Sequence, residues 1–133
     1  MKHIRVVTAV VEKSGLYLIT QRREFAVLPL LWEFPGGKVE PGERDEDALV
    51  RELEKRLGAR ATVGKKLGEK HHAYDGYEVT VALYQATLDE SHPLEARHVK
   101  DFRWVASRDF EDYQFPAADQ ATMDQLLGVP RAV

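Results

Sequence analysis

The chain has 133 residues, of which 44% are hydrophobic and 31% are charged, and its net charge is −3; this predicts a single globular domain over residues 1–133. The absence of cysteine excludes disulfides, thiol nucleophiles and cysteine zinc sites, and the acidic balance argues against a nucleic-acid partner. Because no apolar run reaches membrane-spanning length and no signal-peptide core is present at residues 1–5, we expect a cytoplasmic protein with no membrane partner.

The first elements along the chain are predicted to be strands. Valine-rich residues 3–12 predict one strand, residues 12–15 a turn, and residues 16–20 a second strand, so these two strands should form a hairpin. An apolar loop that contains Pro29 follows at residues 25–32. The N-terminal quarter is therefore expected to be a β-hairpin and a loop.

A helix is predicted over residues 45–57. Leu49, Leu53 and Leu57 recur every four residues and form one apolar stripe. Asp45 is expected to cap the N-terminus, and Gly58 is the residue expected just after the C-terminus.

Strands and short helices are predicted for the rest of the chain. Together with the first helix they indicate an α/β domain. The elements expected, in order, are strands at 61–72 and 77–88 joined by a turn at Asp75-Gly76, a polar loop at 89–100, a strand at 101–105, a short helix capped by Ser107, and a last helix that starts at Pro116 and carries Met123, Leu126 and Leu127.

The most specific motif lies at residues 36–59, where two glycines, an acidic loop and the predicted helix follow one another. This stretch resembles the Nudix box, G-x5-E-x7-R-E-U-x-E-E-x-G-U, in which U is aliphatic. The run Trp32-Glu33-Phe34-Pro35-Gly36 is similar to MutT-like members, and the stretch that ends at Asp119 is similar to cytidine-triphosphate pyrophosphohydrolases. The resemblance implies an α/β/α sandwich around a mixed β-sheet. The residues that fall in register with the box are Gly37, Glu43, Arg51, Glu52, Leu53 and Gly58.

The resemblance also implies a reaction, in which a nucleoside triphosphate and water give a nucleoside monophosphate and pyrophosphate with the help of Mg²⁺ or Mn²⁺. It makes Glu52 a metal ligand or the base that activates water, with Gly37 beside it in the metal site. Glu43 and Arg51 complete the expected catalytic set. The expected partner is a nucleotide, bound by a monomer or a homodimer.

The chain departs from the box at its last two glutamates. Lys55 and Arg56 lie one helical turn after Glu52, where the resemblance implies carboxylate ligands. His98 lies where a further glutamate is usual in the family. Because protonated lysine and arginine cannot ligate Mg²⁺, we expect hydrolysis to be weak.

Three interpretations of this replacement stay open. In the first, Glu52 and Arg56 form an ion pair, Lys55 is a solvated charge and catalysis is lost. In the second, Lys55 and Arg56 hold phosphates directly, and the domain binds or senses a nucleotide without hydrolysing it. In the third, hydrolysis persists because Glu52 works with another carboxylate, from Glu40, Glu43 or Glu54. A DNA-reading module like that of adenine glycosylases is a further alternative, which the net charge disfavours.

The nucleoside end of the ligand is expected at Arg22, Phe34 and Asp119, positions that MutT-like members use to recognise a base. An ionised Asp119 only accepts hydrogen bonds, so it favours an amine such as N4 of cytosine over oxidised guanine. It equally suits the first turn of the last helix. Lys38 follows the glycine turn and is either a phosphate ligand or a surface charge.

Overall fold

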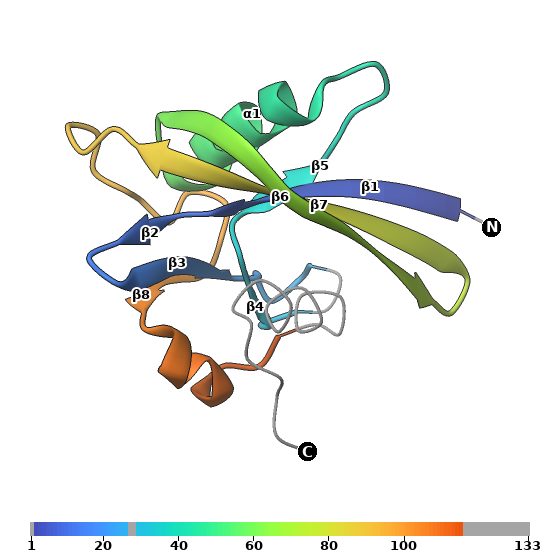
Figure 1. The fold of residues 1–133 in the computed structure, drawn as a ribbon. Helices are drawn as coiled ribbons and strands as arrows, with labels where there is room; N and C mark the ends of the chain where they lie inside the picture. The colour runs from blue at the N-terminus through green and yellow to red at the C-terminus, as the bar shows by residue number, and fades with distance from the viewer. Residues whose placement is uncertain (1, 27–28, 116–133) are drawn as a thin grey trace.

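The computed structural model describes residues 2–26 and 29–115. In this part of the chain the strands form two sheets, and one α-helix packs against the first of them (Figure 1). The elements are β1 (Lys2–Val10), β2 (Glu12–Lys13), β3 (Leu16–Gln21), β4 (Trp32–Glu33), β5 (Gly36–Lys38), α1 (Asp45–Leu57), β6 (Ala61–Tyr74), β7 (Tyr77–Leu88), β8 (Asp101–Val105) and the 3-10 helix η1 (Ser107–Asp112).

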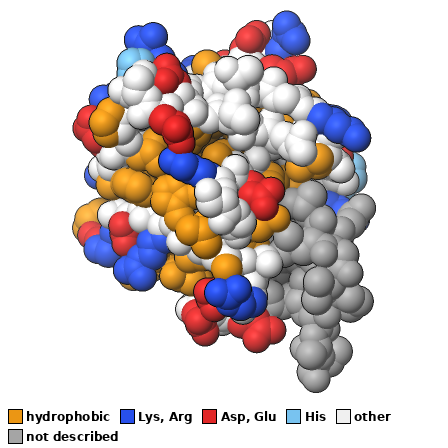
Figure 2. Space-filling model, turned by 60° about the vertical axis from the view of Figure 1, so that its left-hand side comes forward, with side chains coloured by type: hydrophobic (Ala, Val, Ile, Leu, Met, Phe, Trp, Pro, Cys, Tyr) orange, Lys and Arg blue, Asp and Glu red, His pale blue; other side chains and the backbone are white. Residues whose placement is uncertain are grey.

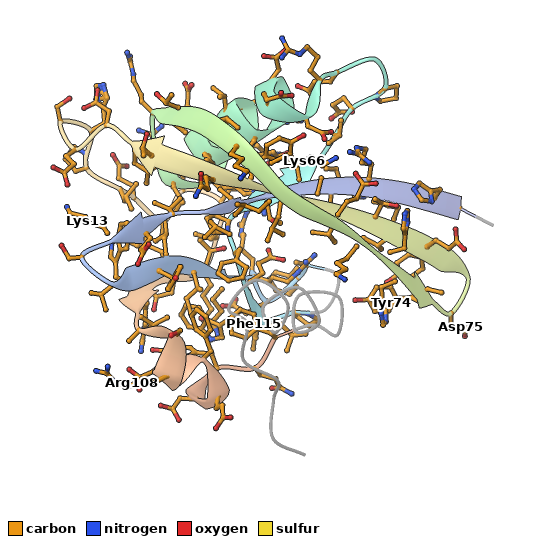
Figure 3. All side chains as sticks on the ribbon, viewed as in Figure 1. Lys13, Lys66, Tyr74, Asp75, Arg108 and Phe115 are labelled. Carbon is orange, nitrogen blue, oxygen red and sulfur yellow. The ribbon has the colours of Figure 1, made fainter. Side chains whose placement is uncertain are left out.

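The first sheet has the strand order β5-β1-β7-β6. β1 runs parallel to β7, whereas β5 and β6 pair antiparallel to their neighbours, so the sheet is mixed, as predicted. β6 and β7 form the expected hairpin, with Tyr74 and Asp75 at its tip (Figure 3). One residue of this hairpin, Tyr84 of β7, donates to Asp45 at the start of α1 at 2.8 Å.

The second sheet has the order β2-β3-β4, and β8 pairs antiparallel along the other edge of β3, from Tyr17 to Gln21. The predicted strand at 3–12 is divided at Val11, which is a correction to the sequence analysis. Its first part pairs with β5 and β7, and only Glu12–Lys13 forms the hairpin with β3. An alternating valine pattern shows which side chains are buried but does not reveal the partner strand, and so the crossing from one sheet to the other was not foreseen.

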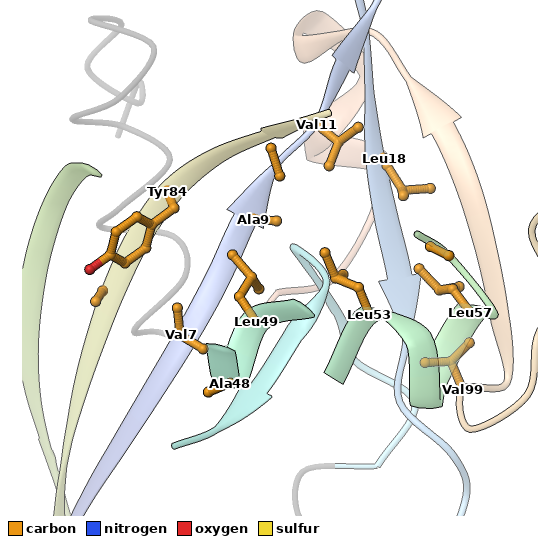
Figure 4. Packing of buried hydrophobic residues seen from close by; sticks show 13 residues of the cluster. Val7, Ala9, Val11, Leu18, Ala48, Leu49, Leu53, Leu57, Tyr84 and Val99 are labelled. Atoms are coloured by element: carbon orange, nitrogen blue, oxygen red, sulfur yellow. The ribbon is translucent and has the colours of Figure 1, made fainter. Parts of the chain in front are cut away.

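Helix α1 has the predicted bounds, and its leucine stripe lies in the main core (Figure 4). Leu49, Leu53 and Leu57 are fully buried against β1, β3 and β7. Burial of each leucine contributes about 1.5–3 kcal/mol relative to exposure. Gly58 ends the helix with φ 65°, and its N–H donates to the Glu54 carbonyl at 2.9 Å.

The two predicted N-caps are wrong. Arg44 and Ala106 occupy the cap positions of α1 and η1, and neither makes a side-chain capping hydrogen bond. Asp45 and Ser107 are instead the first helical residues. The Asp45 carboxylate is already occupied by a partner on β1, described below, which explains why it does not cap its own helix.

A second, aromatic core lies beneath β3 and β4. Phe34 packs edge-on against Phe110 with ring centroids 5.9 Å apart, and Phe115 lies beside β4 (Figure 3). The predicted last helix, with Met123, Leu126 and Leu127, and with it the second helical layer of the sandwich, lies outside the described residues. Within residues 2–26 and 29–115 no helix combines the length and apolar character needed to cross a membrane.

Candidate functional site

The site is built where β5 lies beside the middle of α1. β5 pairs with β1, with Gly37 opposite Val7. A Cβ atom on Gly37 would lie 2.7 Å from both Cγ and Oε2 of Glu52. Glycine therefore lets the backbone lie directly against the Glu52 carboxylate, and the structure brings these two predicted site residues together.

Arg51 joins the acidic loop, β5 and the helix. Its guanidinium donates to both oxygens of Glu43 at 2.9 Å, to the Lys38 carbonyl at 3.0 Å, and to Glu52 Oε1 at 3.0 Å. The hydrogen bond from Arg51 holds the pKa of Glu43 below its usual value. The predicted catalytic set of Glu43, Arg51 and Glu52 is thus assembled around one guanidinium.

Glu52 is 4% exposed and is held between two arginines. Arg51 donates to Oε1, and Arg56 Nε donates to Oε2 at 2.9 Å. Burial acts to raise the pKa of Glu52, but the hydrogen bond and charge of Arg56, together with Arg51 and Lys55, hold it below its usual value. The carboxylate is therefore an anion at neutral pH, and an arginine one turn away neutralises it.

This arrangement does not fit Mg²⁺ or Mn²⁺. Mg²⁺ takes oxygen ligands in octahedral geometry. Both oxygens of Glu52 already accept from guanidinium groups, and Lys55 and Arg56 put cations on the same face. In the two described segments no group of three or more histidine, cysteine, aspartate or glutamate side chains could hold a metal ion.

A second carboxylate, on the partly buried Glu33, lies within the electrostatic reach of Arg56. Arg22 Nη1 donates to Glu33 Oε1 at 3.0 Å. Burial raises the pKa of Glu33, and the charges of Arg22 and Arg56 oppose that rise. Arg56 therefore acts on both Glu33 and Glu52. Together with Arg22, these residues form a set of alternating positive and negative side chains, which we call the charged array: Arg22, Glu33, Arg56 and Glu52.

Glu33 was not foreseen as a site residue. The signal in the sequence was a single acid between Trp32 and Phe34, both of which are buried. A carboxylate in such a position requires a cationic partner, because an isolated buried charge is costly. Arg22, twelve residues before Phe34, was named for substrate binding and not as that partner.

The predicted nucleoside side is only partly described. Phe34 is 1% exposed, because Phe110 and Phe115 cover its ring. Asp119 lies outside the described residues. Lys38 is exposed, and its backbone carbonyl holds Arg51. Arg22, which was predicted to contact the base, is bonded to Glu33. Its Nε atom is buried and has no hydrogen-bond partner among the described residues.

His98 is bonded to the end of α1 and contacts Arg23, a further cationic side chain. Its backbone N–H donates to the Arg56 carbonyl at 3.1 Å, and its Nδ1 lies 3.2 Å from Arg23 Nη1. Burial lowers the pKa of His98, and the charges of Lys55, Arg56 and Arg23 lower it further, against a smaller opposite effect of Glu52. Arg23 was missed from the sequence because it resembles any surface arginine that follows a strand.

Two grooves lie on the surface of the described residues, and neither is lined by Arg22, Glu33, Glu52 or Arg56. One, of about 590 Å³, runs along α1 and is lined by Arg51, Lys55 and Arg97 among others. The other, of about 510 Å³, is lined by residues that include Leu94, Phe102 and Trp104, and none of the predicted site residues lines it. Figure 2 brings forward the side of β2 and β8, where hydrophobic side chains gather between charged ones. The charged array and the apolar groove are therefore separate features.

The chain is similar to known proteins over most of its length. The family model described as "NUDIX domain" matches residues 6–125. The chain is 33% identical to the CTP pyrophosphohydrolase of Escherichia coli K12, over 99% of this chain and 97% of that protein. It is 32% identical to the "Putative 8-oxo-dGTP diphosphatase 2" of Mycobacterium tuberculosis H37Rv, over 91% and 86%. The solution structure of the E. coli ORF135 protein superposes with a TM-score of 0.81 at 31% identity, covering 96% of this chain and 91% of that one.

Proposed function

The chain belongs to the NUDIX domain family, and from this premise we propose that it is a MutT-like nucleoside triphosphate pyrophosphohydrolase. The reaction converts a nucleoside triphosphate and water to a nucleoside monophosphate and pyrophosphate. The names of the relatives support this reaction class, because they include a CTP pyrophosphohydrolase and an 8-oxo-dGTP diphosphatase. We further propose that turnover is slow.

The observation that carries the proposal is the assembly of Glu43, Arg51 and Glu52 against the Gly37 backbone. In this arrangement Glu52 is the proposed base, an anion that would accept a proton from water only in competition with the two arginines that hold its oxygens. Arg51 fixes the position of its carboxylate, and Glu43 fixes Arg51 in turn. Hydrolysis is slow because Arg56 occupies the second oxygen of Glu52, and the cations at Lys55 and Arg56 replace ligands for a divalent ion.

The proposed substrate is a cytosine nucleotide. Asp119 is the proposed acceptor for N4 of cytosine and Arg22 is the proposed neighbour of the base, whereas the ring of Phe34, expected to contact the base, is covered by Phe110 and Phe115. The 33% identity to a CTP pyrophosphohydrolase supports this choice. Lys38 is proposed to contact a phosphate, since its side chain is exposed just after the glycine turn.

A second candidate function is nucleotide binding without turnover. The ion pair of Glu52 with Arg56 at 2.9 Å favours it, because that carboxylate is already neutralised. In this case the same residues bind the nucleotide, and the nucleotide dissociates without being hydrolysed.

The two functions are separated by a hydrolysis screen with Mg²⁺ and with Mn²⁺. The screen covers common and modified nucleoside triphosphates, and chromatography resolves the products. The proposal expects monophosphate and pyrophosphate in equal amounts, with CTP or dCTP preferred. Binding of CTP with no products would establish the second function, and products from a dinucleotide or nucleotide sugar alone would contradict the proposed substrate class.

A further inference from the structure

Two cationic side chains near His98 have no carboxylate partner among the described residues. Arg22, Arg51 and Arg56 each have a carboxylate partner within 3.0 Å. In the described residues no salt bridge joins Arg23 or Lys55 to a carboxylate. Glu24, the acid next to Arg23, is bound instead by Lys100. Two positive charges are therefore left over on this side of the molecule, both on exposed residues.

His98 lies in contact with Arg23 and within the electrostatic reach of Lys55. Arg23 contacts its Nδ1 atom at 3.2 Å, and the charge of Lys55 acts on the same imidazole. Because a guanidinium only donates hydrogen bonds, Nδ1 must be the acceptor in this contact. The hydrogen of the neutral ring is then on Nε2, which is left as a donor.

The backbone makes the arrangement rigid at His98. The N–H groups of Arg97 and His98 both donate to the carbonyl of Arg56, at 2.9 and 3.1 Å. On the other side, the N–H of Lys100 donates to the carbonyl of Gln21, at 2.9 Å, just before Arg23. The loop of His98 is thus tied to the end of α1 and to the end of β3, the two elements that carry the cations.

We propose that Arg23, Lys55 and the Nε2–H of His98 form a phosphate-binding site that works without a divalent cation. The ligand class is the polyphosphate chain of a nucleoside triphosphate, and in naming a nucleotide the proposal rests on the proposed function. Guanidinium and ammonium groups are the side chains that bind phosphate oxygens most strongly. Here they replace a metal that the carboxylates of the site do not fit.

The neighbouring carboxylates do not repel such a ligand. Glu52 is neutralised by Arg51 and Arg56, and Glu33 lies between Arg22 and Arg56. The same Arg56 links the cation site to the Arg22 side, where the base is proposed to lie. A triphosphate bound at Lys55 and Arg23 would therefore extend along a surface on which the acids already have cationic partners.

The test measures binding of inorganic triphosphate and of CTP by calorimetry, in EDTA and in Mg²⁺. The wild-type chain should bind both ligands in EDTA. Arg23→Gln and Lys55→Gln should each weaken binding of inorganic triphosphate by about tenfold, since each removes one charged hydrogen-bond donor. Lys65→Gln is the matched control, because Lys65 is exposed on β6 and has no salt bridge within the described residues; it should change the affinity by less than about twofold.

Each outcome decides the proposal. Binding that requires Mg²⁺, or losses in Arg23→Gln and Lys55→Gln no larger than in Lys65→Gln, would overturn the site and leave the proposed hydrolase untouched. Metal-independent binding that both substitutions weaken would support the site. If CTP then binds in EDTA but is never hydrolysed, the phosphate site stands and the proposed hydrolysis fails.

Discussion

Glu52 is a charged residue of a surface helix whose own side chain is not exposed. It is buried, and both of its oxygens accept hydrogen bonds from arginines on its own helix. Exposed ion pairs contribute little, but a buried carboxylate that loses its partners carries its full desolvation cost. The pair of Glu52 with Arg56 was one of the interpretations left open by the sequence, and the structure forms it.

Glu52→Gln should lower the free energy of unfolding by about 1–3 kcal/mol, because Arg51 and Arg56 lose a charged acceptor. Glu54→Gln on the same helix is the control, since Glu54 is exposed and should have an effect of less than about 0.5 kcal/mol. Urea unfolding at neutral pH measures both. Equal stability of the two variants would show that the buried array contributes nothing to folding.

Gly37→Ala should destabilise the protein by about 1–3 kcal/mol, because its Cβ would overlap the Glu52 side chain. Gly68→Ala is a suitable comparison, since nothing lies within 4 Å of a Cβ at that position and its φ is not positive. Thermal unfolding checks the difference. A Gly37→Ala protein as stable as Gly68→Ala would mean that the close approach of β5 to Glu52 is not required.

Some residues of the candidate site could be predicted from the sequence, and others could not. Glu43, Arg51 and Glu52 were identified from their spacing, because a motif with fixed offsets on a helix and a preceding loop brings those side chains together. Glu33 and Arg23 were missed, since their roles depend on partners from distant parts of the chain. Arg23 contacts His98, which lies seventy-five residues further along the chain.

At the scale of elements, α1, β7 and β8 have the bounds that the sequence predicted. In α1 the leucine spacing and the following Gly58 fixed both ends correctly. The role of Asp45 was wrong, because Arg5 of β1 donates to its two oxygens at 2.9 and 2.7 Å, and Tyr84 of β7 donates at 2.8 Å. The residue type at position 45 favours an N-cap, but its carboxylate binds two residues of the sheet instead. Contacts of this kind join distant parts of the chain, and so a local sequence pattern does not predict them.

Asp45→Asn should therefore weaken the attachment of α1 to the sheet by about 1–2 kcal/mol at neutral pH. Asp47→Asn makes the same charge change in the same helical turn, but Asp47 is exposed and should have little effect. Urea unfolding of both variants and the wild type, followed as a function of pH, measures the difference.

The pH dependence of that difference has a defined sign. The hydrogen bond from Arg5, helped by Tyr84, holds the pKa of Asp45 below its usual value, against burial. The folded pKa is thus below the unfolded one, near 3.9. The contribution is fully present above about pH 4 and is lost as the pH falls through the folded pKa. Wild type and Asp45→Asn should converge in acid, and a constant difference down to the lowest pH would contradict the ion pair.

At the scale of the whole molecule, two sheets meet at a single charged array. The first sheet brings Gly37 to Glu52 of the helix, and the segment that follows β3 of the second sheet brings Arg22 to Glu33 and Arg23 to His98. The sequence predicted the mixed sheet and the strands, but not the division of the first strand between two sheets. Residues from both sheets therefore lie near α1, and the charge of Arg56 acts on Glu33 of β4 as well as on Glu52 of its own helix.

The central claim is that Lys55, Arg56 and His98 stand in place of metal ligands and limit hydrolysis. The direct measurement is Mg²⁺-dependent hydrolysis of CTP by the triple variant Lys55→Glu, Arg56→Glu, His98→Glu. The control is Arg60→Glu, Lys65→Glu, His92→Glu, which changes the same residue types away from the array. We expect turnover to rise by about tenfold or more in the first and to stay at the wild-type level in the control, a change of about 1.4 kcal/mol or more in the barrier. A folded triple variant that hydrolyses CTP no faster than the control would contradict the claim.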